Sequence, residues 1–191
     1  MHTRIIILLS LLYSSLLISE PRTIIHEGVE REYIVHVPDS FNEDSPVVFV
    51  IHGFTGSAGQ IMEYSGMNTI ADREGFLVVY PQGTTDSEGN TFFNVGYEFH
   101  KDSTIDDVSF IRDLFTLLSE EYSLKRKQGF ATGMSNGGDM SYLLACTSAD
   151  LFRAVAPVAG SLMSKTKDMW NTQSPVPIFE IHGTGDQITL F

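Results

Sequence analysis

Two nearly continuous apolar runs separated by a helical pattern constrain the fold more than any other feature of this chain. Residues 46–53 read PVVFVIHG and residues 76–81 read FLVVYP. Short apolar runs that end at glycine or proline are typical of strands buried on both faces. Between them, residues 60–75 space their apolar side chains as one helix that Gly75 can close. A strand, a helix and a strand in this order predict a crossover unit of a parallel sheet.

The same alternation continues along the chain. At the amino-terminal end, residues 22–28 and 31–38 are rich in β-branched side chains and predict an antiparallel edge hairpin that turns at Glu27 and Gly28. The later predicted elements are a helix at 106–122 with a capping box at Ser103 or Thr104, a strand at 128–133, a helix at 136–146, and strands at 152–160 and 176–183. We therefore expect an α/β sandwich of three layers with a mostly parallel sheet.

Residues 1–19 have the pattern of a secretory signal peptide. Arg4 supplies a positive start, residues 5–18 are largely apolar, and Ser19 is a small residue suited to cleavage. The apolar stretch is shorter than the roughly 20 residues that a membrane span needs. We expect export of one mature domain, residues 20–191, to the periplasm or outside the cell. An uncleaved membrane anchor is the alternative.

Composition excludes several classes of partner. The net charge is −12, and removal of the leader, whose one charged residue is Arg4, takes it to −13. Such a surface repels nucleic acid and anionic lipid, so we expect no nucleic-acid partner, no stable membrane association and a neutral substrate. Cys146 is the only cysteine, so no intrachain disulfide forms, and its apolar neighbours predict a buried, inert thiol.

The chemistry centres on Ser135. The stretch Gly133-Met134-Ser135-Asn136-Gly137 matches G-x-S-x-G and falls between a predicted strand and a predicted helix, which is the context that a nucleophile elbow requires. A serine on such a turn has strained backbone angles, and neighbours without side chains allow the strand and the helix to approach closely. We therefore predict that Ser135 is a nucleophile and that Gly133 and Gly137 make room for it.

An activated serine also needs donors for the oxyanion and an acid that orients a base. The backbone N–H of Asn136, at the start of a helix, is one expected donor. The other is expected from the loop after residues 46–53, at Phe54, with Thr55 as the alternative, while His52 is expected to brace that loop. Asp186, just beyond the strand at 176–183, is the expected acid; the alternative is a turn residue that follows Gly183 and Gly185.

Two long irregular segments, residues 82–102 and 161–175, leave from the carboxyl ends of predicted strands. Ligands of open parallel sheets bind beyond those ends. The aromatic residues of these segments are Phe92, Phe93, Tyr97, Phe99 and Trp170. Local packing is the expected role for most of them, and a substrate contact is the alternative.

These motifs resemble the α/β-hydrolase superfamily and, within it, the secreted polyhydroxybutyrate depolymerase-like and feruloyl esterase-like group. The resemblance rests on the stretches VVFVIHGFTGSA, FLVVYPQGT, DDVSFI, ATGMSNGGDMSYLLAC, FRAVAPVAG and PIFEIHGTGDQI, in the family's order. It implies Ser135 as nucleophile, Asp186 as triad acid, oxyanion donors at Phe54 and Asn136, and ester hydrolysis without a metal or organic cofactor.

The family places its catalytic histidine after a further strand beyond the acid, whereas this sequence stops at Phe191. His100 is the one histidine in a loop on the active edge and is a weak substitute. We therefore expect a chain cut after the acid, without the last strand and helix of the fold. It would lack the base and leave an apolar sheet edge uncovered.

These observations predict a secreted serine esterase. Candidate substrates are feruloyl or acetyl esters on polysaccharide, hydroxyalkanoate oligomers and small synthetic esters. A serine peptidase on the same fold is one alternative, since the elbow does not distinguish amides from esters. A non-catalytic protein that binds sugar or polymer through its aromatic loops is another.

Overall fold

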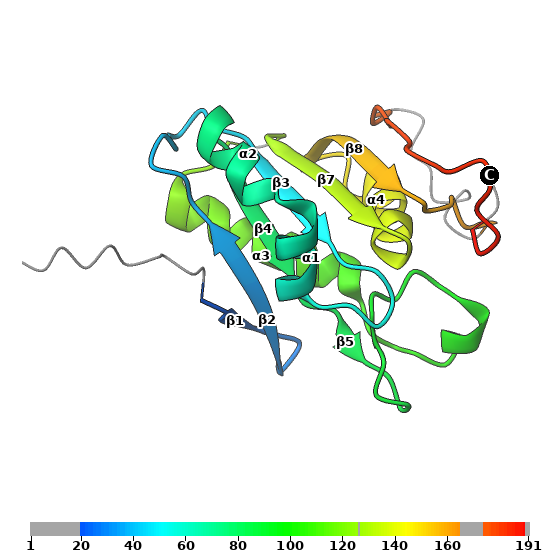
Figure 1. Ribbon diagram of the computed structural model, residues 1–191. Coiled ribbons are helices and arrows are strands. Elements are labelled where there is room, and N and C mark those ends of the chain that lie inside the picture. The colour runs from blue at the N-terminus through cyan, green and yellow to red at the C-terminus, as the bar shows by residue number, and fades with distance from the viewer. Residues whose placement is uncertain (1–19, 126, 165–173, 190–191) are drawn as a thin grey trace, which may run out of the picture.

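The computed structural model describes residues 20–125, 127–164 and 174–189, so the predicted leader and most of the segment 161–175 lie outside the described residues (Figure 1). Six strands form one sheet in the order β1 (Arg22–His26), β2 (Val29–His36), β4 (Leu77–Pro81), β3 (Val47–Ile51), β7 (Gly129–Met134) and β8 (Phe152–Val158). β1 and β2 are antiparallel to their neighbours and the other pairs are parallel. This is the predicted mixed sheet with its antiparallel edge hairpin.

Helices cover both faces of this sheet. They are α1 (Ala58–Ser65), α2 (Met67–Glu74), α3 (Asp107–Tyr122) and α4 (Asn136–Thr147). Alternate residues of β3 explain the layers: Phe49 packs in the apolar cluster that includes α3 and α4, whereas Val50 packs in the cluster that includes α1 and α2. Because the central strands are buried on both faces, their side chains form nearly continuous apolar runs. The three-layer prediction is confirmed.

The helix predicted at 60–75 is wrong as a single element. Gly66 has a φ of 60°, ends α1 and starts α2, while Gly75 closes α2 as expected. Both glycines adopt the left-handed conformation, which costs little without a Cβ atom. The apolar spacing continues across the break, so it did not reveal two helices.

The cap of α3 also differs from the prediction. Asp106, and neither Ser103 nor Thr104, is the N-cap, and its carboxylate accepts a hydrogen bond from the N–H of Ser109. A short aspartate side chain reaches the third helical amide directly, so the helix begins later than the predicted capping box would place it.

The predicted strand at 176–183 is reduced to two isolated parallel bridges beside β8. They pair Val155 with Ile178 and Val158 with Ile181. The segment therefore runs in the direction of β8, and its carboxyl end lies at the same edge of the sheet as that of β8. Phe179 and Ile181 are exposed.

The segment 82–102 contains a hairpin of β5 (Thr84–Thr85) and β6 (Thr91–Phe92), followed by a short 3-10 helix, η1 (Glu98–His100). It extends beyond the carboxyl ends of the central strands (Figure 1). Phe92 and Phe93 are buried, as local packing predicts, whereas Phe99 is exposed. Within the described ranges, no helix is both long and apolar enough to span a bilayer.

Candidate active site

Ser135 occupies a strained turn between β7 and α4. Its backbone has a φ of 54° and a ψ of −119°, which an L-residue rarely adopts. The N–H of Ser135 donates to the carbonyl oxygen of Val158 at 2.9 Å, and its carbonyl oxygen accepts from the N–H of Asp139 at 2.9 Å. The residue is half-buried. Bonds on both sides therefore hold the serine at the carboxyl edge of the sheet.

Glycines allow this turn to pack against β3. A Cβ atom on Gly133 would lie 2.5 Å from the carbonyl oxygen of Gly137 and 2.7 Å from that of Ile51. A Cβ atom on Gly137 would lie 2.7 Å from the carbonyl oxygen of His52. These neighbours are backbone atoms and cannot rotate away, so a side chain at either glycine requires the helix to move.

The loop after β3 lies directly beside the turn. A Cβ atom on Gly53 would be 3.5 Å from that of Ser135. The N–H of Thr55 donates to the carbonyl oxygen of Thr91 at 2.8 Å, so it is engaged elsewhere. Among the described residues, no acceptor binds the N–H of Phe54 or that of Asn136. These two amides have the free donor capacity that an oxyanion site needs.

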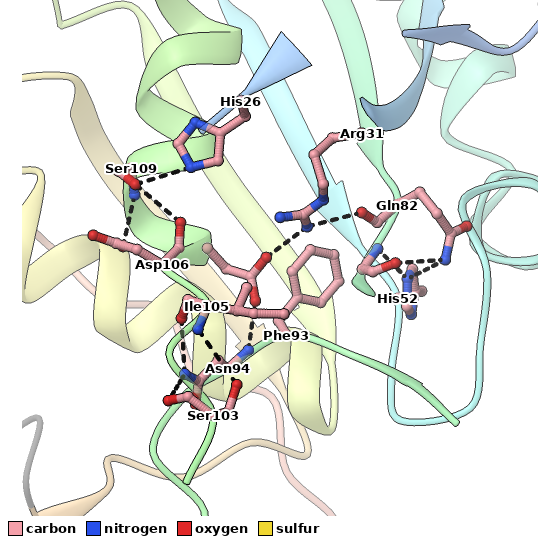
Figure 2. Close-up of polar contacts among 12 residues, drawn as sticks. His26, Arg31, His52, Gln82, Phe93, Asn94, Ser103, Ile105, Asp106 and Ser109 are labelled. Atoms are coloured by element: carbon pink, nitrogen blue, oxygen red, sulfur yellow. Dashed lines mark hydrogen bonds and ion pairs between the residues drawn. The ribbon is translucent and has the colours of Figure 1, made fainter. Parts of the chain in front are cut away.

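His52 braces this loop, as its position in the sequence suggested. Its Nε2 atom accepts from the N–H of Gly83 at 3.0 Å and lies 3.2 Å from Nε2 of Gln82 (Figure 2). Its Nδ1 atom lies 2.7 Å from the carbonyl oxygen of Gly53. The acceptor role of Nε2 assigns the proton to Nδ1. Burial lowers the pKa of His52, which favours this neutral ring.

Asp186 lies in a turn beyond the segment that pairs with β8. Its Oδ1 atom accepts from the N–H groups of Ile188 at 2.9 Å and Thr189 at 3.0 Å, and these bonds lower the pKa of the carboxyl group. Its Oδ2 atom is 3.6 Å from Nε2 of His182. No contact joins Asp186 to Ser135 in the described parts of the chain. Both nevertheless lie at the carboxyl edge of the sheet.

The imidazole of His182 is engaged within the same turn. Its Nε2 atom donates to the carbonyl oxygen of Thr189 at 2.7 Å, and its Nδ1 atom is 3.2 Å from a carboxylate oxygen of Glu180. The hydrogen bonds to Thr189 and to Glu180 raise the pKa of His182. A ring held in this way steadies the turn that carries Asp186.

His100 does not approach Ser135 through any described contact. Its Nε2 atom is 3.2 Å from a carboxylate oxygen of Asp86, and its ring lies 3.8 Å from that of Phe92, centroid to centroid. Exposed Phe99 and Phe54 complete an aromatic group around it. His100 therefore packs the base of the segment 82–102 in this structure.

The sequence reading missed the polar side chains that tie α4 to its surroundings. Asp139 accepts from the hydroxyl of Tyr97 at 2.5 Å and from the N–H of Ser161 at 2.6 Å, and burial raises the pKa of its carboxyl group. The side chain of Asn136 binds the backbone of Phe93. Asp139 could have been recognised from the sequence, because it is an acidic residue in the first turn of an otherwise apolar helix. No sequence pattern indicated the contact of Asn136 with Phe93.

A cavity of about 320 Å³ opens beside the loop after β3. Its walls include Phe54, Gln60, Ile61, Tyr64 and Met134. Met134 immediately precedes Ser135, so the cavity adjoins the nucleophile turn. Among the described residues, no group of three or more His, Cys, Asp or Glu side chains is arranged to hold a metal ion.

Comparison with known proteins identifies the family. The family model described as esterase PHB depolymerase matches residues 32–174. The chain belongs to this family. The matched range contains Ser135 and the loop at Phe54, and it ends before Asp186.

Curated relatives of the chain are esterases by name. It is 28% identical over 163 residues to a bifunctional acetylxylan esterase/xylanase of Neocallimastix patriciarum, covering 85% of this chain and 22% of that protein. It is 28% identical over 174 residues to feruloyl esterase D of Neurospora crassa, covering 84% of this chain and 55% of that protein. The chain thus spans only part of the length of these relatives.

Solved structures share the fold. An acetyl xylan esterase from Aspergillus awamori has a TM-score of 0.62 at 20% identity, covering 82% of this chain and 57% of that one. An S-formylglutathione hydrolase from Agrobacterium tumefaciens has a TM-score of 0.68 at 15% identity, covering 87% of this chain and 76% of that one. The fold is that of α/β-hydrolase esterases.

Proposed function

We propose that this protein is a serine hydrolase of carboxylic esters in which Ser135 forms the acyl-enzyme. The observation that carries the proposal is the strained turn at Ser135, beside two amides that have no acceptor among the described residues. A serine hydroxyl held in this conformation attacks an ester carbonyl, the alcohol leaves, and water then releases the acid. Membership of an esterase family and the names of the relatives support this reaction class.

The oxyanion of the tetrahedral intermediate is assigned to the N–H groups of Phe54 and Asn136. Phe54 is preferred over Thr55 because the N–H of Thr55 already donates to Thr91. Asn136 starts α4, so its amide adds the positive end of the helix dipole. Loss of one such donor typically lowers the rate by about 10² to 10³.

Asp186 is assigned as the acid that orients the general base. Its Oδ1 atom accepts from two backbone N–H groups, so Oδ2, which lies 3.6 Å from Nε2 of His182 in this structure, is the oxygen that we assign to the imidazole of the base. The lowered pKa of its carboxyl group keeps it ionised at neutral pH, as this role requires. The base itself is not assigned to a histidine of the described chain.

The substrate is proposed to be a neutral carboxylic ester, either a small molecule or an ester on a polymer such as a feruloylated or acetylated polysaccharide or a hydroxyalkanoate. The apolar wall formed by Phe54, Ile61 and Met134 supports an apolar group next to the scissile bond. The pattern of residues 1–19 supports secretion.

Active-site labelling tests the nucleophile. Treatment of the full-length protein with a fluorophosphonate should modify the peptide that contains Ser135, and the Ser135→Ala variant should not be labelled. Hydrolysis of p-nitrophenyl acetate but not of aminoacyl nitroanilides should separate an esterase from a peptidase. Labelling at another residue of the folded protein, or turnover retained in Ser135→Ala, would contradict the proposal.

A further inference from the structure

The segment Thr91–Phe93 joins the two amides assigned to the oxyanion. At one end, Thr91 bonds to the loop that carries Phe54. At the other end, Phe93 bonds to the side chain of Asn136, whose backbone N–H is the second donor. Three consecutive residues therefore connect elements that lie far apart in the sequence.

Thr91 holds the loop through two hydrogen bonds. Its carbonyl oxygen accepts from the N–H of Thr55 at 2.8 Å, and its hydroxyl donates to the carbonyl oxygen of Gly56 at 2.5 Å. Thr55 has a φ of 65°, a conformation that a β-branched residue adopts only when its surroundings impose it. Because Phe54 directly precedes Thr55, the direction of its N–H depends on these bonds.

At the other end of the segment, the side chain of Asn136 makes two hydrogen bonds with the backbone of Phe93. Its Oδ1 atom accepts from the N–H of Phe93 at 2.8 Å, and its Nδ2 atom donates to the carbonyl oxygen of Phe93 at 2.9 Å. Both residues are fully buried. A buried side-chain amide bonded at both its oxygen and its nitrogen holds Phe93 relative to the start of α4.

The next residue anchors the segment to the core. The N–H of Asn94 donates to Asp107 at 2.6 Å, and the same carboxylate accepts from the buried guanidinium of Arg31 at 2.6 Å (Figure 2). On the other side, a Cβ atom on Gly83 would lie 2.5 Å from the carbonyl oxygen of Phe92. Residues 91–94 are therefore held by a hydrogen bond to Asp107 on one side and lie in close backbone contact with Gly83 on the other.

We propose that Thr91 is a positioning residue for ester hydrolysis. Through its carbonyl and hydroxyl groups it sets the N–H of Phe54 at the separation from the N–H of Asn136 that one oxyanion requires. The inference rests on the proposed function of Ser135 and adds a residue outside the nucleophile, acid and oxyanion set. Because a displacement of about 1 Å in such a site costs about 10²-fold in rate, a hydroxyl that holds the loop affects kcat.

Valine and serine at position 91 test this role in the full-length protein. Thr91→Val keeps the shape and the carbonyl but loses the bond to Gly56, whereas Thr91→Ser restores the donor. Thr85→Val is the matched control, because exposed Thr85 pairs with Thr91 in the hairpin and its side chain makes no hydrogen bond with the described residues. Thermal unfolding of each variant confirms that the assay temperature leaves it folded.

The expected result is a fall in kcat of about tenfold for Thr91→Val with KM within about twofold, since the lost contact acts on the transition state. The inhibition constant of a boronic acid, which mimics the tetrahedral intermediate, should weaken by the same factor. The kcat of Thr91→Ser should recover to within about threefold of that of the unmodified protein, and the kcat of Thr85→Val should equal that of the unmodified protein.

Two results would overturn the role of Thr91. One is equal kcat for Thr91→Val and Thr85→Val. The other is a loss in Thr91→Val that appears in KM or in thermal stability alone and is not recovered by Thr91→Ser. Either result leaves the function of Ser135 intact if Ser135→Ala abolishes turnover, whereas turnover in Ser135→Ala would refute the proposed function itself.

Discussion

Replacement of Gly137 by alanine should damage both stability and catalysis, although it adds a single methyl group. The new Cβ atom would lie 2.7 Å from the carbonyl oxygen of His52 and nearer still to that of Ile51. Cβ atoms essentially never approach other atoms within 3.0 Å. Both obstructing oxygens belong to the backbone at the end of β3, so α4 must move away from the sheet.

The magnitude follows from what this movement disturbs. Overpacking a rigid contact costs about 1–3 kcal/mol in the free energy of unfolding. The displaced first turn of α4 carries Ser135 and Asn136, while the obstructing residues Ile51 and His52 lead into the loop of Phe54. The serine and the two amides therefore separate, and kcat should fall by about 10²-fold.

Chemical denaturation and ester hydrolysis measure the two effects, and Gly59→Ala is the matched control. Gly59 lies in α1, and a Cβ atom there would meet nothing within 4 Å. Alanine in a helix is favoured over glycine by about 1 kcal/mol, so Gly59→Ala should raise stability and leave kcat unchanged. A Gly137→Ala protein with the stability and kcat of the parent would refute the close-packing explanation of the elbow.

Three further perturbations have defined outcomes. Because burial lowers the pKa of His52 in the folded protein, the stability that the neutral ring contributes is complete above its ordinary pKa of 6.5 and is lost as pH falls through the lower folded value. In urea titrations across this range, the free energy of unfolding should therefore fall less in His52→Gln than in the unmodified protein. Equal falls in the two proteins would contradict the role of His52 as a neutral brace. Arg31→Met leaves the buried carboxylate of Asp107 without its cation and should cost about 3–5 kcal/mol by urea denaturation, whereas a loss below about 1 kcal/mol would show that the pair is dispensable. Gln60→Trp narrows the cavity of about 320 Å³ and should lower kcat/KM for bulky aromatic acyl esters about tenfold more than for acetyl esters. An equal fall in kcat/KM for both kinds of ester would show that the acyl group binds outside this cavity.

The sequence predicted the features that depend on local pattern. The buried strands β3 and β4 follow from apolar runs, and the turn between β1 and β2 at Glu27 and Gly28 has the positive φ values that a tight hairpin needs. The roles of Ser135 and Asp186 stay predictions, because no contact joins the two residues in the described parts of the chain. Gly66 was missed because the helical spacing of apolar residues continues on both sides of it.

Contacts between distant polar groups could not be predicted in this way. The bonds of Asn136 to Phe93 and of Thr91 to Gly56 join residues separated by 43 and 35 positions, and neither pair belongs to a periodic pattern. Phe54 and Thr55 could not be distinguished from their residue types, since both offer a backbone N–H. The assignment of Phe54 depends on the hydrogen bond from the N–H of Thr55 to Thr91 in the hairpin, and this bond is known only from the tertiary structure.

The distribution of strained backbone explains why the site depends on so much of the fold. Among the described residues, six other than glycine have a positive φ, and three of them, Thr55, Ser135 and Ala159, lie at the carboxyl edge of the sheet. Each conformation costs about 1–3 kcal/mol, and each N–H is held by a carbonyl from another segment, at Thr91, Val158 and Ile181. One hydrogen bond contributes only about 1 kcal/mol, so the bond alone does not offset the strain. The packing of the layers that hold the three acceptor carbonyls must contribute the remaining free energy. A substitution that loosens this packing should therefore reduce catalysis before it unfolds the protein.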